Sequence, residues 1–105
     1  MKFDRATGTL YATSTSGTVS TLYTIDQNTG TTTVVGSITG VPVQIAMAIS
    51  NGGQMYVYDI DNAGVAQSRL FSVDKTTGAA TLVGSMGFVG RYAQDMDFDP
   101  LTGTL

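Results

Sequence analysis

The chain has 105 residues, a formal net charge of −3, 42% hydrophobic residues and 12% charged residues, a composition typical of one small folded domain. It contains no cysteine and no histidine, which excludes disulfides, thiolate sites and imidazole chemistry. Lysine and arginine total only five, so a nucleic-acid surface is unsupported, and no apolar run approaches the ~20 residues that span a bilayer.

The chain reads as all-β, because no segment of ten or more residues carries the apolar spacing of an amphipathic helix. Residues 1–4 read as the end of a strand, and their sequence lacks the apolar core of a signal peptide. Apolar and β-branched residues bounded by Gly, Asn and Asp predict eight strands. These are Thr9–Thr13, Thr21–Asp26, Thr31–Ser37, Gln44–Ser50, Gln54–Tyr58, Arg69–Asp74, Ala79–Ser85 and Ala93–Asp99.

One stretch of the sequence occurs twice. Residues 22–37 and 70–85 are identical at eight of sixteen positions, 48 residues apart. A period of this length indicates a propeller, a solenoid or a similar array. We divide the single segment 1–105 into a first repeat at 5–50, a second at 51–99 and the start of a third at 100–105.

A turn motif, Asp-x-x-Thr-Gly, recurs at Asp4, Asp26, Asp74 and Asp99. Its Asp can accept hydrogen bonds from later backbone N–H groups, and its Gly supplies a positive φ, so each copy predicts a tight hairpin. Residues 50–53 form a shorter equivalent. In an antiparallel sheet of four strands A to D, these turns join A to B and C to D. All tight turns then lie at one end, and the longer loops lie at the other.

The phrases Asp-Phe-Asp-Pro-Leu-Thr-Gly-Thr-Leu and Leu-Tyr-Thr-Ile-Asp-x-x-Thr-Gly, in repeats of about 46 to 49 residues, resemble the blades of bacterial β-propellers. The chain is most similar to secreted or cell-surface propellers with Asp-Pro-x-Thr-Gly-x-Leu-Tyr repeats, in the style of the NHL and YVTN groups. The Trp-Asp signature of WD40 repeats and the Asp-box of sialidases are absent. The resemblance implies two four-stranded antiparallel blades, a bacterial extracellular or cell-surface location, and a role in binding or adhesion.

The two ends of the chain match each other. Residues 3–10 and 98–105 agree at six of eight positions. Two blades alone would expose apolar faces, and propellers close with about four to eight blades. We therefore expect copies to complete a six- or eight-bladed ring as a homotrimer or homotetramer, with Ala93–Asp99 pairing with Thr9–Thr13 of the next copy. A piece of a longer propeller would show the same ends.

Asp95 and Asp97 stand on one face of the predicted strand Ala93–Asp99, together with Asp99. Repeated around a ring, they could hold Ca²⁺ through oxygen ligands. Structural or solvated carboxylates are the alternative, because the matching residues of the previous repeat are Ala46 and Ala48. We otherwise expect no metal and no cofactor.

The loop end gathers the remaining candidates for ligand binding. Phe88, Arg91 and Tyr92 combine aromatic and cationic groups typical of contact surfaces, although they could instead seal a blade junction. Asp61 and Asn62 lie in a polar loop whose opening resembles a calcium loop but which lacks the required glutamate at its twelfth position.

The sequence favours a non-enzymatic binding or adhesion module whose ligand is a surface polymer or protein. Two alternatives stay open. One is an Asp-dependent propeller lyase or hydrolase, against which the missing histidine, cysteine and glutamate weigh. The other is a purely structural fragment of a larger propeller.

Overall fold

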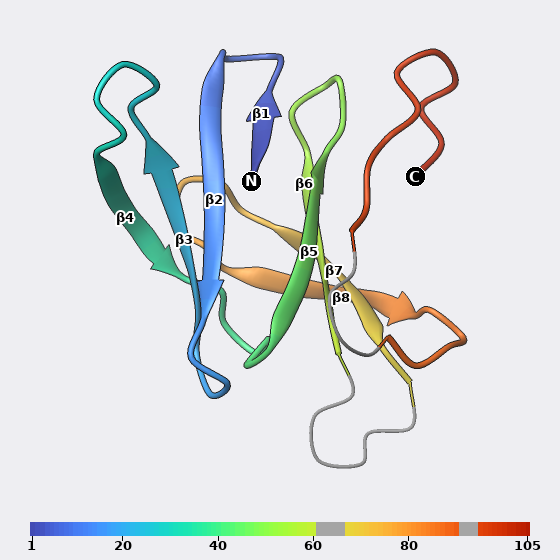
Figure 1. Ribbon diagram of the computed structural model, residues 1–105. Helices are drawn as coiled ribbons and strands as arrows, with labels where there is room; N and C mark the ends of the chain where they lie inside the picture. The colour runs from blue at the N-terminus through green and yellow to red at the C-terminus, as the bar shows by residue number, and fades with distance from the viewer. Residues whose placement is uncertain (61–66, 91–94) are drawn as a thin grey trace.

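The computed structural model describes residues 1–60, 67–90 and 95–105 and contains two antiparallel sheets of four strands each (Figure 1). The first sheet has the order β1-β2-β3-β4 and the second the order β5-β6-β7-β8. The strands are β1 (Lys2–Asp4), β2 (Thr9–Thr15), β3 (Ser20–Ile25), β4 (Thr32–Ser37), β5 (Gln44–Ile49), β6 (Met55–Asp59), β7 (Arg69–Val73) and β8 (Ala80–Ser85). The all-β prediction with two four-stranded antiparallel sheets is therefore confirmed. In the described part of the chain, no helix is long and apolar enough to cross a membrane.

One predicted strand does not form as expected. Residues 95–99 belong to no strand, and positions 93 and 94 lie outside the described residues. The reason is physical: an extended segment becomes a strand only when a neighbour completes its hydrogen bonds. By contrast, the short segment Lys2–Asp4 does form β1, because β2 pairs with it through Lys2↔Tyr11, Phe3↔Leu10 and Asp4↔Thr9.

The Asp-x-x-Thr-Gly motif folds in the same way each time it occurs. The Asp carbonyl accepts the N–H of the motif's Gly, and the Asp Oδ1 accepts the N–H two residues after the Asp. The Gly has φ between 72° and 85° in all four copies. The predicted tight hairpins are thus confirmed at Asp4, Asp26 and Asp74, whereas Asp99 forms the turn without flanking strands. Figure 1 shows the β1–β2, β3–β4 and β5–β6 turns at the same end of the molecule.

The repeat also extends to irregularities in the sheets. The β3–β4 register shifts after Leu22, which pairs with Gly36, and the β7–β8 register shifts after Leu70, which pairs with Gly84. A β-bulge lies at each shift, 48 positions apart, because 70 − 22 = 48. The outer strand pair is therefore one structural unit used twice.

The hydrophobic core lies between the two sheets, because its members come from both and form one cluster. From the first sheet and the segment after it come Tyr11, Leu22, Ile38 and Val41. From the second sheet come Met47, Ile49, Met55, Val57, Phe71 and Val73. Strand β5 contacts both inner strands of the first sheet, β1 and β2, so the second sheet packs against the first along β5.

A buried serine fixes the crossing between the sheets. Ser20, which is 1% exposed, donates through Oγ to the Pro42 carbonyl and accepts the Gln44 N–H at 3.0 Å. Ser68, directly before β7, is also buried, and its Oγ accepts the Gly90 N–H at 2.8 Å. The same device therefore anchors the segment that leaves each sheet.

Candidate functional site

The loop end of the first sheet carries a hollow of about 290 Å³. It is formed by the β2–β3 loop and by the segment that crosses to the second sheet. Its lining combines hydroxyl groups with small apolar side chains: Thr18, Val19, Ser20, Ser37, Ile38, Thr39, Gly40, Val41 and Pro42. Hydroxyls and backbone groups around a small apolar floor can hydrogen-bond and pack against a neutral polar ligand, such as a sugar ring.

Sequence reasoning placed these two loops at the binding end but singled out none of their residues. The signal was present in the Ser/Thr/Gly composition of residues 14–20. What composition could not show is that Ser20 is buried and already bonded, so it shapes the hollow instead of facing a ligand. Thr18, on the rim, remains exposed and can reach one.

Four of the residues predicted for ligand binding, Asp61, Asn62, Arg91 and Tyr92, lie outside the described residues. Phe88 lies inside them, and its side chain is 48% exposed while its carbonyl accepts the Ser68 N–H. Asp59, which precedes the polar loop, is 4% exposed and accepts hydrogen bonds from the Arg69 N–H and guanidinium, the latter at 2.9 Å from Nε. Asp59 is therefore a structural carboxylate.

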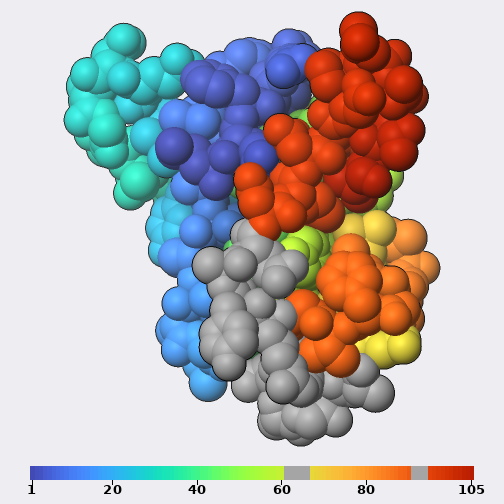
Figure 2. Space-filling model, turned by 45° about the vertical axis from the view of Figure 1, so that its right-hand side comes forward, coloured from blue at the N-terminus to red at the C-terminus, as the bar shows by residue number. Residues whose placement is uncertain are grey.

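Asp95 and Asp97 come together around a lysine. The Lys2 ammonium lies 3.5 Å from Asp95 and 3.4 Å from Asp97, whose side chains are 79% and 69% exposed. A hydrogen bond from the Met96 N–H, together with the charge of Lys2, holds the pKa of Asp95 below its ordinary value. In Figure 2 the residues after position 95 lie against the N-terminal residues, in agreement with these contacts.

This arrangement bears on the calcium hypothesis, because the Lys2 ammonium already lies between the two carboxylates and offsets one of their two charges. Among the described residues, no group of three or more His, Cys, Asp or Glu side chains could hold a metal ion. We expect the melting temperature of the chain to stay unchanged when Ca²⁺ is added and then chelated. A rise with Ca²⁺ that the chelator reverses would contradict this prediction; Asp95→Asn should then abolish the rise.

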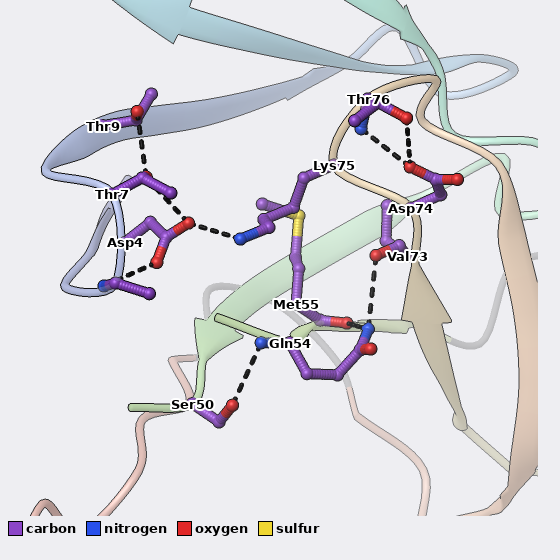
Figure 3. Close-up of polar contacts among 11 residues, drawn as sticks. Asp4, Thr7, Thr9, Ser50, Gln54, Met55, Val73, Asp74, Lys75 and Thr76 are labelled. Atoms are coloured by element: carbon purple, nitrogen blue, oxygen red, sulfur yellow. Dashed lines mark hydrogen bonds and ion pairs between the residues drawn. The ribbon is translucent and has the colours of Figure 1, made fainter. Parts of the chain in front are cut away.

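Asp4 is the most deeply buried carboxylate of the described residues, at 0% exposed. It bonds to the Thr7 hydroxyl at 3.0 Å, to the Ala6 N–H at 3.0 Å and to the Lys75 ammonium, which comes from the β7–β8 turn (Figure 3). Burial raises the pKa of Asp4, but these hydrogen bonds together outweigh it, and the pKa lies below its ordinary value of 3.8. The pair is an ionic link between the two sheets, and its residues are 71 positions apart.

The outer strands leave apolar side chains in water. Val34 on β4 is 62% exposed, and Leu82 and Val83 on β8 are each 57% exposed. Val34 and Leu82 occupy equivalent positions of the two sheets, 48 residues apart, and are exposed to a similar degree.

Comparisons with models of protein families, with curated proteins and with solved structures found no match to this chain. The likeness to propeller blades therefore stays a prediction from the sequence.

Proposed function

We propose that the chain is a non-enzymatic binding or adhesion module of a bacterial extracellular β-propeller, with a surface polymer or protein as its ligand. The observation that carries the proposal is the division between the two ends of the sheets. One end repeats the same Asp-x-x-Thr-Gly turn, whose polar groups bond to one another. The other end bears the longer connections and the hydroxyl-lined hollow. Ligands of a rigid β scaffold usually meet its variable loops.

A neutral polysaccharide is the ligand chemistry that the hollow fits best. Its lining residues carry no formal charge, and hydroxyls next to apolar atoms suit a sugar ring better than a charged group. A protein ligand would meet the same loops.

The experiment is a glycan array, followed by a binding titration and a hydrolysis assay on each glycan that binds. We expect Thr18→Arg, which fills the hollow, to weaken binding at least about tenfold. Asn28→Arg, on the tight-turn end, is the matched control and should bind as the unmodified chain does. Equal loss in both variants would place the ligand elsewhere. Turnover of a bound glycan would instead favour the alternative, an Asp-dependent lyase or hydrolase.

We also propose that copies of the chain assemble into a ring, as a homotrimer or homotetramer. β1 pairs with β2 only over Thr9–Tyr11, so residues 12–15 of β2 have no neighbour on the inner side within the described chain. In the ring, segment 93–99 of another copy would take the place of β1 beside β2. Because that segment is longer than β1, it would pair with more of the β2 edge. Light scattering at micromolar concentration tests the proposal, and a clean monomer would refute it.

A further inference from the structure

The contact between the two sheets of one chain has two complementary sides. The side contributed by the first sheet, here called the leading face, consists of Tyr11, Leu22, Val35, Ile38 and Val41. The side contributed by the second sheet, here called the trailing face, consists of Met55, Val57, Phe71, Val73 and Ala80. Because side chains alternate along a strand, each sheet carries both faces, one on either side.

Glycines bring the two faces into backbone contact. A Cβ on Gly36 of the leading face would overlap the Thr77 carbonyl of the β7–β8 turn. A Cβ on Gly78 in that turn would lie 2.7 Å from the Ser37 carbonyl. The turn of the second sheet therefore sits directly on β4 of the first, and only glycine fits at both positions.

The second sheet carries a second leading face. Its residues lie 48 positions after Leu22, Val35, Ile38 and Val41 of the first leading face. They are Leu70, Val83, Met86 and Val89. Leu22, Ile38 and Val41 are at most 2% exposed, whereas Val83 is 57% exposed and the other three equivalents are half-buried. Gly84, the equivalent of Gly36, has no atom of the described residues within 4 Å of its would-be Cβ.

The first sheet likewise carries a second trailing face. Strand alignment places Leu10, Ala12, Tyr23 and Ile25 at the positions of Met55, Val57, Phe71 and Val73. All four are half-buried, whereas their equivalents in the second sheet are fully buried. Gly30, the equivalent of Gly78, has no described atom within 4 Å of its would-be Cβ.

We propose that two copies of this chain dock onto each other. The trailing face on the first sheet of one copy would pack against the leading face on the second sheet of the other, with the Thr29 carbonyl of the first copy over Gly84 of the other. The junction would repeat, between copies, the packing that already joins the two sheets of one chain. It is a heterologous contact, and it rests on the ring assembly proposed above.

The inner part of this leading face is already occupied in a way that fits the proposal. The Phe98 ring lies 5.8 Å from the ring of Tyr56, the equivalent of Tyr11. Residues 95–99 thus stand on the second sheet where β5 stands on the first. The incoming copy would therefore contribute β2, β3 and β4, while residues 95–99 replace its β1.

The turns at this junction differ from those inside the chain in their charge. Inside the chain, Lys75 of one turn pairs with Asp4 of the other. Between copies, the equivalent residues are Gln27 and Ser50, which are neutral. A charge brought to either turn alone would be left without a partner in the contact, whereas opposite charges on both would restore a pair.

The first test is Gly84→Val, studied by light scattering over a range of concentrations. The change meets open space within a single chain, so folding should persist, as circular dichroism will show. Self-association should weaken at least about tenfold, because the new side chain stands where the Thr29 carbonyl must lie. If the unmodified chain assembles and Gly84→Val assembles equally well, the docking proposal is wrong and the ring forms by another contact. If the unmodified chain is a monomer, ring assembly itself fails.

The second test pairs two substitutions in the facing turns. Ser50→Asp alone should weaken self-association about tenfold, by placing an unpartnered carboxylate in the contact. Adding Gln27→Lys should restore it to the level of the unmodified chain or tighter. A double variant that associates no better than Ser50→Asp would overturn the proposed juxtaposition of these turns.

Discussion

Replacing Gly36 by valine is expected to separate the two sheets of the chain. The new Cβ would overlap the Thr77 carbonyl, which belongs to backbone held in a tight turn and cannot rotate away as a side chain could. Overpacking of this kind costs about 3 kcal/mol of unfolding free energy. For a chain of this size, the melting temperature should fall by roughly 12 to 24 °C. Thermal unfolding followed by circular dichroism measures the change.

The chain supplies its own control for this prediction. Gly84 occupies the same bulged position on β8 and pairs with Leu70 as Gly36 pairs with Leu22. At concentrations where the chain is monomeric, Gly84→Val should shift the melting temperature by only a few degrees. Equal losses in the two variants would mean that the glycine is needed by the bulge and not by the contact between sheets.

Replacing Lys75 by methionine should produce the second large effect. Asp4 would stay buried with its carboxylate bonded only to Thr7 and to the Ala6 N–H. Removing one partner of a buried ion pair leaves an uncompensated charge, at a cost of about 3 kcal/mol. The Asp4→Asn/Lys75→Met double variant should recover much of that loss, because no charge remains buried.

The same pair gives stability a defined dependence on pH. The folded-state pKa of Asp4 is below 3.8, so the unfolded chain binds the proton first as the pH falls. The contribution of Asp4 is therefore fully present above the ordinary value and disappears as the pH falls through the lowered folded-state pKa. In Lys75→Met the folded-state pKa rises, and acid unfolding should begin at higher pH.

Lys2→Met is the matched control for charge loss. Lys2 pairs with Asp95 and Asp97, which are mostly exposed, and pairs of that kind contribute about 0 to 1 kcal/mol. Denaturant titrations at neutral and acidic pH should show little change for this variant. If Lys2→Met and Lys75→Met lose equal stability, burial of Asp4 is not what makes its pair important.

Most of the fold was predictable because short sequence motifs determine it. The Asp-x-x-Thr-Gly turns fix where strands end, and the doubled stretch fixes which strands correspond. The strand at 93–99 was predicted from its pattern alone, but 95–99 lacks a neighbour in the described chain that could complete it.

The contacts between sheets were not predictable in the same way. Nothing local marks Gly36 as a contact glycine, since Gly84 has the same sequence neighbourhood and meets nothing. The link between Asp4 and Lys75 spans the chain, and its only sequence signal is a concerted difference. The turns that face each other inside the chain carry Asp4 and Lys75, whereas the equivalent positions of the other sheet carry Ser50 and Gln27.

Of the predicted binding residues, the structure describes Phe88, Asp95 and Asp97, and it brings only the last two together. It does so through Lys2, from the far end of the sequence. The hollow near Thr18 was missed, because its walls come from two separate loops whose approach depends on the buried Ser20.

The hydrogen bond between Ser20 and the Gln44 amide makes it possible to measure how often the two sheets separate. The Gln44 N–H belongs to the first residue of β5, yet its acceptor is a side chain of the other sheet. Deuterium can enter at this amide when the sheets part, even if each ladder stays intact. Its exchange rate, compared with that of an amide in the middle of β6, therefore separates the opening of the interface from the unfolding of the sheets.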